Sequence, residues 1–415
     1  MTHEILVLGA GYAGLAAARK IAHDARTRAL DVRVTLVNAS SDFVERVRLH
    51  EVAAGRDVGT HPLSEPLEGT DIDLVVGWVE GIDPEARRVS VRVEGEVRTL
   101  TYDTLVHALG SSEGRSTVPG ASEHALTCAT LDGARAIAAR ITADRPGRLA
   151  VVGGGHTGVE LAAEIAESHP GIRVDLLTRG RVAPGTSERG RAHVLRVLDR
   201  LGVTVRENID VAEVDATGVR LVDGARVTAD LVAWTVGFSV SPLAREAGLT
   251  VADDGRALVD ITQRSVSHPD VYVVGDVAHG SDPGGGVMRM SCATGLPMGW
   301  TAAEVILDRV AGREPSRTAF GYLNLCVSLG RRDGLIQFVT ADDRPRSLVL
   351  KGRVAARYKE FIVAGAYGGL CGSTRTADSN FSLLRRVARR TAKRHAASAA
   401  GTAAAETGAV GAAGR

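Results

Sequence analysis

Short apolar runs lead into glycine turns and then into helical patterns at two places in the chain. Residues 5–8 read ILVL and run directly into a turn with glycines at Gly9, Gly11 and Gly14. Apolar positions then recur at helical spacing to about residue 23, and a second apolar run occupies 32–38. This order predicts a strand, a tight turn, a helix and a second strand parallel to the first.

The second copy of this order lies in the middle of the chain. An apolar strand at 149–152 leads into the turn 153–158, and a helix at 158–168 and a strand at 173–178 follow. Its glycines are Gly153, Gly155 and Gly158.

The spacing of these glycines is typical of dinucleotide-binding turns. The first glycine permits the tight turn, the second lets the backbone approach a pyrophosphate, and the third lets helix and strand pack closely. The pyrophosphate then lies at the positive end of the helix. Two glycine turns without a ligand are the simpler alternative, but they would not explain why the whole order of elements repeats.

The residue that ends the second strand of each unit differs between the two copies. An acid at this place binds a bare ribose, whereas arginine binds a 2′-phosphate. The first unit has Asn38, an amide that can still pair with a ribose hydroxyl. The second has Arg179, followed by Arg181, which favours NADPH over NADH, although Arg181 fits a solvated loop charge equally well.

Other apolar runs predict further strands. Residues 102–111, 228–238 and 270–279 each contain an apolar strand that leads into a small residue. In the last range the strand ends in Gly275-Asp276, whose carboxylate can accept from a polyol hydroxyl. Runs in the C-terminal part predict a small α+β region with strands LIQFV, SLVLKG and EFIVAGA at 335–339, 347–352 and 360–366.

Residues 380–395 predict a basic amphipathic helix. Phe381, Leu384, Val387 and Ala388 share one face, and arginines occupy most of the other. Such a helix can lie on an anionic membrane or dock on the protein with its basic face in solvent, and the pattern favours neither. The Ala/Gly-rich residues 396–415 predict a disordered tail.

Composition and charge argue against several classes of protein and of site. With 415 residues the chain is long enough for two or three domains, and a net charge of +1 gives no general attraction to nucleic acid. We find no apolar run long enough to span a membrane and no export leader, so we expect a cytoplasmic protein. The four cysteines lie far apart, which predicts neither disulfides nor a metal site.

Together these features resemble the two-dinucleotide-binding-domain flavoproteins of the pyridine nucleotide–disulfide oxidoreductase superfamily. Within it the chain is most similar to type II NADH dehydrogenases and apoptosis-inducing-factor-like NAD(P)H:quinone reductases. The resemblance implies an α/β fold with two Rossmann-like domains, one for FAD and one for NAD(P)H, and a small C-terminal α+β region. The expected parts are an FAD domain in two halves (1–115 and 236–305), an inserted NAD(P)H domain (116–235), the C-terminal region (306–379), the basic helix (380–395) and the tail (396–415).

The resemblance also assigns residues to the cofactors. For FAD these are the three glycines of the first turn, Asn38 at the ribose, Val79 at the adenine, Ala108 and Gly110 near the pyrophosphate, and Gly275 and Asp276 at the ribitol. For NAD(P)H they are the three glycines of the second turn, Arg179, Gly237, and Glu160 near the nicotinamide as the catalytic candidate. A helix starting within 288–300, with Ser291 as its N-cap, would aim its positive end at the flavin.

The resemblance says less about the residues at the flavin ring and about the electron acceptor. Segment 43–55 resembles the stretch that covers the flavin ring, and its charged residues Arg46, Arg48, His50 and Glu51 are candidates for the active site. A plain amphipathic helix with solvated charges explains them equally well. The paired cysteines of disulfide reductases are missing, so electrons would leave the flavin directly for a quinone-like acceptor. The alternatives are a ferredoxin- or rubredoxin-reductase-type protein and a redox-sensing flavoprotein; a homodimer and a peripheral place on the inner face of the cell membrane also remain open.

Overall fold

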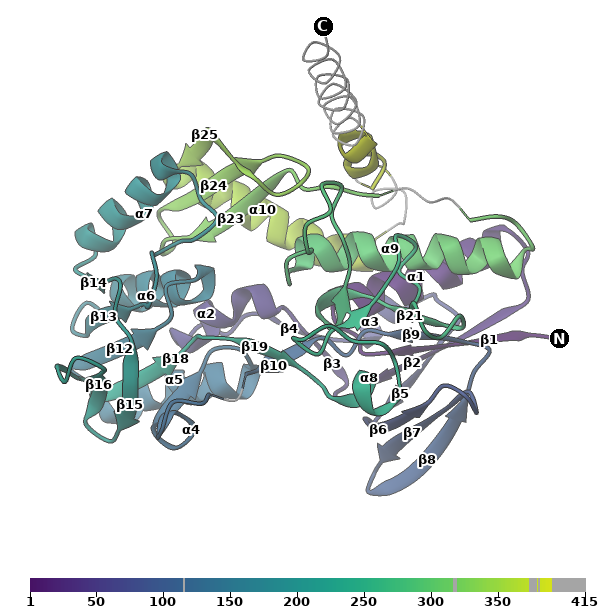
Figure 1. Ribbon diagram of the computed structural model, residues 1–415, viewed down its shortest axis with the longest axis horizontal. Helices are drawn as coiled ribbons and strands as arrows, with labels where there is room; N and C mark the ends of the chain where they lie inside the picture. The colour runs from purple at the N-terminus through teal and green to yellow at the C-terminus, as the bar shows by residue number, and fades with distance from the viewer. Residues whose placement is uncertain (115, 316–318, 373–378, 380, 390–415) are drawn as a thin grey trace, which may run out of the picture.

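Two five-stranded parallel sheets organise the chain, one on each side of the molecule in Figure 1. The computed structural model describes residues 1–114, 116–315, 319–372, 379 and 381–389. Each sheet is built around one of the two predicted strand–turn–helix–strand units. The predicted α/β class with two Rossmann-like units is therefore confirmed.

The first sheet has the strand order β21-β9-β1-β2-β5. Its strands are mostly apolar, as expected for a parallel sheet that is covered on both faces. Four of them precede the second sheet in the sequence, whereas β21 follows it. The strands are β1 (His3–Leu8), β2 (Val32–Asn38), β5 (Ile72–Val76), β9 (Thr104–His107) and β21 (Val271–Val273).

Two long helices, α1 (Tyr12–Thr27) and α9 (Cys292–Val310), lie side by side against this sheet (Figure 1). A Cβ atom on Gly299 would lie 2.3 Å from the Ala13 carbonyl oxygen, so this close approach of the two helices requires glycine. The packing places the N-termini of both helices at the same end of the sheet.

The second sheet has the order β11-β18-β12-β13-β14, with α5 (Leu131–Asp144), α6 (His156–Ser168) and α7 (Glu188–Arg200) packed on it. An antiparallel three-stranded sheet accompanies each parallel sheet, so the two halves repeat one design. The strands of the second sheet are β11 (Ala125–Thr127), β12 (Arg148–Val152), β13 (Arg173–Leu177), β14 (Thr204–Arg206) and β18 (Leu231–Trp234). The accompanying strands are β6 (Trp78–Asp83), β7 (Arg88–Val93) and β8 (Glu96–Thr101) in the first half, and β15 (Val211–Asp215), β16 (Gly218–Leu221) and β17 (Arg226–Thr228) in the second.

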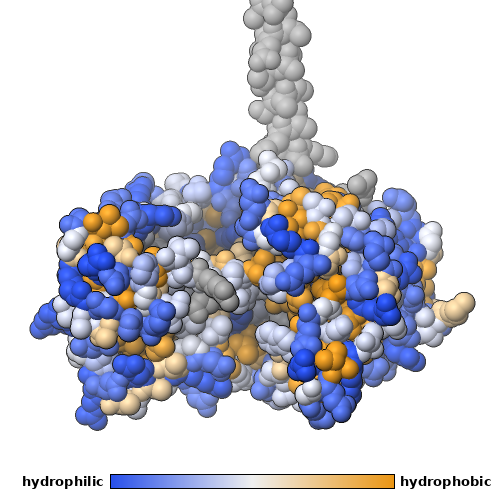
Figure 2. Space-filling view, turned by 60° about the horizontal axis from the view of Figure 1, so that its bottom comes forward, coloured by the Kyte–Doolittle hydropathy of each residue, from blue (hydrophilic) through white to orange (hydrophobic). Residues whose placement is uncertain are grey.

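Two short antiparallel strands, β10 (Ser111–Glu113) and β19 (Phe238–Val240), pair where the chain passes between the halves. The face shown in Figure 2 is mostly hydrophilic and is hollowed between the two lobes of the molecule.

Segment 43–55 is not one helix with solvated charges, and that alternative is wrong. It forms β3 (Asp42–Val44), paired with β4 (Thr60–Pro62), then a short 3-10 turn η1 (Arg46–Arg48) and α2 (Leu49–Ala53). Helix α2 leaves the first half and packs on α5 and α6, where its apolar residues join the second core. Its charged residues are buried because the partners of this helix come from elsewhere in the chain.

The C-terminal region is an antiparallel sheet with one helix. Its strands are β23 (Asn324–Ser328), β24 (Gly334–Val339) and β25 (Pro345–Lys351), and α10 (Gly352–Cys371) follows. The predicted strand EFIVAGA is wrong, because it lies inside α10. The buried positions Ala355, Lys359 and Val363 recur every four residues, which is the helical period.

The predicted basic helix is described only for residues 381–389, which are helical. There Phe381 and Ala388 are buried, and the Phe381 ring lies 5.6 Å from that of Trp300 on α9. The apolar face is therefore docked on the protein body, as in the second alternative. Residues 390–395 and the predicted tail lie outside the described residues. Among the described helices, we find none with the length and apolarity that a membrane crossing requires.

Candidate active site between two nucleotide cradles

The first glycine turn forms a cradle at the N-terminus of α1. A Cβ on Gly9 would lie 2.5 Å from the Ala108 oxygen, and one on Gly14 would lie 1.9 Å from the Gly9 oxygen. A Cβ on Gly11, by contrast, would meet nothing within 4 Å. Two glycines thus hold the turn closed, while the third leaves open space in front of the helix N-terminus.

The second turn repeats this geometry at the N-terminus of α6. A Cβ on Gly153 would lie 2.5 Å from the Thr235 hydroxyl oxygen, and one on Gly158 would lie 1.9 Å from the Gly153 oxygen. Again the middle glycine, Gly155, faces open space. Both cradles therefore have the shape and the positive helix end that fit a pyrophosphate.

Asn38 lies at the end of β2 and supports the first cradle. Its Oδ1 accepts from the Ala10 backbone N–H at 2.9 Å, and its Nδ2 donates to the Ser40 carbonyl at 2.8 Å. Val79 is buried on β6, so its side chain belongs to the first core. Ala108 and Gly110 follow β9, where Gly110 has a φ of +72°.

Asp276 and Arg46 lie close together beside the first cradle. The Ser111 hydroxyl donates to the Asp276 carboxylate at 2.6 Å, and Arg46 Nη1 lies 3.7 Å from the same carboxylate. Arg46 also donates to the Ser111 carbonyl at 2.8 Å and to the Ala129 carbonyl, in the second half, at 3.2 Å. This arginine therefore connects the two halves next to the residue proposed for the ribitol.

The N-terminus of α9 faces the same region. Ser291 occupies the predicted N-cap position of α9, although its side chain does not accept from a backbone N–H. Its hydroxyl instead lies 3.1 Å from the Thr294 hydroxyl. The first amides of α9 are therefore left without a cap from this serine. Burial raises the pKa of the Cys292 thiol, so the residue that opens the helix is a neutral thiol.

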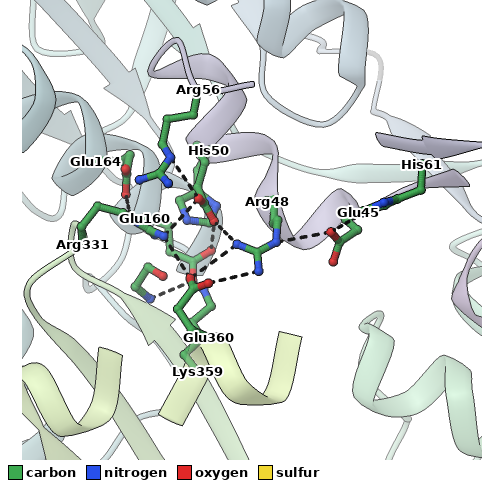
Figure 3. Close-up of polar contacts among 12 residues, drawn as sticks. Glu45, Arg48, His50, Arg56, His61, Glu160, Glu164, Arg331, Lys359 and Glu360 are labelled. Carbon is green, nitrogen blue, oxygen red and sulfur yellow. Dashed lines mark hydrogen bonds and ion pairs between the residues drawn. The ribbon is translucent and has the colours of Figure 1, made fainter. Parts of the chain in front are cut away.

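Glu160 reaches out of the second cradle into a cluster drawn from three parts of the chain (Figure 3). Its carboxylate pairs with Lys359 of α10, accepts from the Ser328 backbone N–H at 2.9 Å and lies 3.9 Å from His50 Nδ1 on α2. Burial would raise the pKa of Glu160, but the ammonium of Lys359 opposes it and prevails, so the pKa is lowered. Glu160 is therefore ionised at neutral pH.

His50 is neutral, because burial lowers its pKa to about 3. Its ring is almost fully buried, and Nε2 has no hydrogen-bond partner among the described residues.

A ring of ion pairs surrounds this cluster (Figure 3). Arg331 lies 3.0 Å from Glu51, 3.1 Å from Glu164 and 3.0 Å from Glu360, and Arg48 lies 2.8 Å from Glu51 and 3.1 Å from Glu360. These contacts tie the C-terminal region to both halves.

Arg179 lies at the mouth of the second cradle, and its side chain is 86% exposed. It lies 3.9 Å from the Asp210 carboxylate, whereas Arg181 is paired with Glu188 at 2.9 Å. Gly237, with a φ of +79°, lies beside the pairing of β10 with β19, and a Cβ added to it would meet no atom within 4 Å.

Several residues of the cluster and of the ring around it are not predicted from the sequence: Lys359, Ser328, Arg331, Glu164 and Glu360. Lys359 lies within α10, beside the run whose composition suggests a strand. A lysine at a core-facing position of a helical pattern is the signal that could have identified it, since a lysine is rarely buried without a partner.

Comparison with known proteins identifies the family and the fold of this chain. A family model described as pyridine nucleotide-disulphide oxidoreductase matches residues 3–304. The NADH dehydrogenase-like protein Rv1812c of Mycobacterium tuberculosis is 31% identical over 330 residues, which are 74% of this chain and 80% of that protein. Demethylphylloquinone reductase NdbB of Synechocystis is 27% identical over 298 residues, 68% of this chain and 73% of that protein.

Among solved structures, NDH2 of Plasmodium falciparum in complex with NADH superposes with a TM-score of 0.75. The match covers 95% of this chain and 98% of that one at 15% identity, which supports the fold alone. The family resemblance predicted from the sequence is confirmed by the match over residues 3–304. The chain belongs to the pyridine nucleotide-disulphide oxidoreductase family, and its relatives include NADH dehydrogenase-like proteins.

Proposed function

We propose that this protein is an FAD-dependent NAD(P)H dehydrogenase that passes electrons to a quinone-like acceptor without a redox disulfide. The observation that carries the proposal is the set of side-chain contacts that connect the surroundings of the two cradles. Glu160 extends from the second cradle toward α2 and α10, while Arg46 joins Asp276, beside the first cradle, to the second half.

The cysteines support direct electron transfer from the flavin to the acceptor. All four are free: Cys128, Cys292, Cys326 and Cys371. None has another cysteine within the four-residue spacing of a redox pair. FAD, when bound, supplies the step between a two-electron hydride donor and the acceptor.

The residues of the chain would align and hold the reactants. The open glycines Gly11 and Gly155 leave room for the two pyrophosphates, and the Asp276 carboxylate can accept from a polyol hydroxyl. Lys359 and Ser328 hold the Glu160 carboxylate in place, where it can orient the nicotinamide end of the second nucleotide. This division assigns positioning to the protein and electron transfer to the cofactors.

The relatives point to the acceptor class. One of those matched is named a demethylphylloquinone reductase, and another, from Mycobacterium tuberculosis, a type II NADH:quinone oxidoreductase. A quinone acceptor is therefore the finer proposal. For the donor, the exposed Arg179 favours NADPH, because an arginine at this strand end can bind a 2′-phosphate.

Double-mixing stopped flow tests this function. The purified, FAD-containing protein is reduced anaerobically by a slight excess of NADPH or NADH and then mixed with a soluble quinone. We expect the oxidised flavin spectrum to return within the turnover time, and reduction to be faster with NADPH. A flavin that the nucleotide reduces but the quinone does not reoxidise would contradict the proposed acceptor.

A further inference from the structure

Three polar side chains, His61, Glu45 and Tyr12, follow one another in a line from the solvent to the start of α1. None of them is assigned to a cofactor above or belongs to the ring of ion pairs. His61 on β4 is 30% exposed, and its Nε2 lies 2.9 Å from the Glu45 carboxylate. Glu45 is itself only 7% exposed. The line therefore connects an accessible imidazole to a buried carboxylate.

The inner end of the line is the Tyr12 hydroxyl. Tyr12 is the first residue of α1, directly after the open Gly11 of the first cradle. Its hydroxyl is buried and has no hydrogen-bond partner among the described residues. Burial raises the pKa of Tyr12 well above its usual value, and the nearby Cys292 and Glu45 add to this effect. The Tyr12 ring lies 5.0 Å from that of Phe43, two residues before Glu45. Helix α9 packs on Ala13, the next residue of α1, so Tyr12 lies between the segment of Glu45 and the start of α9.

Aromatic rings pack along this line. The His61 ring stacks on Tyr367 of α10 at 3.9 Å, and Phe43 lies between Tyr367, at 5.3 Å, and Tyr12, at 5.0 Å. The Tyr367 hydroxyl is occupied, since it donates to Glu65 at 2.8 Å. The outer face of His61 thus gives the line its exchange with solvent.

The other charged groups around Glu45 cannot carry a proton in its place. Arg48 of η1 lies 3.4 Å from the Glu45 carboxylate, but a guanidinium does not release its proton at physiological pH. Glu160 and Lys359 are paired with each other. The imidazole and the carboxylate are in hydrogen-bond contact, and the phenol of Tyr12 is the next group along the line that can donate and accept a proton.

The proposed reaction needs a route by which one proton reaches the acceptor from solution. Its balance is NAD(P)H + H⁺ + quinone → NAD(P)⁺ + hydroquinone. The quinone gains two electrons and two protons, of which the nicotinamide supplies the electrons and one proton as hydride. The second proton must come from solution.

On the basis of the proposed function, we propose that His61, Glu45 and Tyr12 relay this proton from solvent to the acceptor. The imidazole passes a proton to the Glu45 carboxylate, which passes it to the Tyr12 oxygen as the phenol gives its own proton to the reduced acceptor. Tyr12 and Glu45 do not meet at hydrogen-bonding geometry, so a small side-chain shift or one bridging water completes the line. His61 then regains its proton from solvent.

Two acceptors measured on the same variants test the relay. A soluble quinone consumes protons, whereas ferricyanide takes single electrons and no proton. We expect Glu45→Gln and His61→Ala to lower the quinone turnover by about 10- to 100-fold, within the usual size of general acid catalysis. Their ferricyanide turnover should stay within about twofold of the wild type, since neither change touches electron transfer. Imidazole added to His61→Ala should restore quinone turnover, but the same addition should not restore Glu45→Gln.

Matched controls are Asp42→Asn, which removes an exposed carboxylate from the same short strand pair, and His124→Ala, which removes an exposed imidazole elsewhere. Both should keep both activities. Equal losses with the two acceptors would show a structural defect and overturn the relay, as would unchanged quinone turnover in Glu45→Gln. A wild type that ferricyanide reoxidises and quinone does not would overturn the proposed acceptor, and the relay with it.

Discussion

At the scale of single residues, the two cradles separate glycines that shape the turn from glycines that leave room for a ligand. Gly14 and Gly158 are closed in by backbone oxygens, whereas Gly11 and Gly155 face open space. The sequence spacing already predicts a separate role for each glycine. The three-dimensional contacts support the role of the middle one, because a side chain there would occupy open space in front of the helix.

This distinction predicts opposite behaviour for two substitutions in one turn. Gly158→Ala would place its Cβ 1.9 Å from the Gly153 oxygen, so we expect a loss of stability of a few kcal/mol, typical of steric strain in a packed site. Gly155→Ala should fold normally but raise the KM for the nucleotide about tenfold or more, because the methyl group occupies space needed for the pyrophosphate. Thermal unfolding and steady-state kinetics on both variants measure this. Equal melting temperatures for the two would contradict it.

Burial of a single carboxyl predicts a pH dependence of stability. Burial raises the pKa of Glu164 to about 7, although Arg331 opposes the shift. Between the usual glutamate pKa and pH 7, the native state therefore holds a proton that the unfolded state has released. The contribution of Glu164 to stability is thus lost progressively as the pH rises through this window.

Replacement of Glu164 by glutamine should remove this loss. Relative to the wild type, the free energy of unfolding of Glu164→Gln should increase between pH 5 and pH 8 by on the order of 2 kcal/mol. Urea unfolding at the two pH values measures the change. Glu360→Gln is the control, because the pKa of Glu360 is lowered, so its removal should bring no gain at pH 8. Parallel pH profiles for the wild type and Glu164→Gln would rule the interpretation out.

At the scale of elements, local patterns predict the strands and helices around each glycine turn but not those of the acceptor side. Strand β2 has the predicted bounds, 32–38, because an apolar run between polar residues is a local signal. The run EFIVAGA carries β-branched and aromatic residues and so resembles a strand. It becomes helical because it continues a 20-residue pattern whose buried positions contact β24 and α1.

The charged residues of α2 also show that local sequence patterns cannot predict contacts between distant parts of the chain. Glu51 is 2% exposed because Arg331, 280 positions later, lies 3.0 Å away. No pattern within 43–55 contains this partner. The glycines, Asn38 and Asp276 could be placed from sequence, whereas Lys359 and Arg331 depend on the tertiary fold.

The pair between α6 and α10 predicts a non-additive effect on stability. Lys359→Met leaves the Glu160 carboxylate buried beside a neutral side chain, and we expect a loss of about 3–5 kcal/mol. In the double variant Glu160→Gln, Lys359→Met, neither charge of this pair is left buried alone, so most of this loss should be recovered. Free energies of unfolding for the two single variants and the double variant complete the cycle. Losses that simply add would show that the two side chains do not depend on each other.

At the scale of the whole molecule, three parts of the chain converge on one site. The two parallel sheets each present a helix N-terminus with an open glycine, and the C-terminal sheet and α10 close the side between them through Lys359 and Arg331 (Figures 1 and 3). This arrangement accounts for the presence of two cradles in one chain, since a hydride can pass only between cofactors held face to face.

The central claim is that the two cradles hold FAD and NAD(P)H together in one working site. Anaerobic rapid mixing of the FAD-containing protein with one equivalent of NADPH tests it directly. We predict that the absorbance of the oxidised flavin is lost in a single turnover, and that Gly155→Ala slows this loss at subsaturating NADPH. A protein that binds FAD but whose flavin neither NADPH nor NADH reduces would contradict this claim.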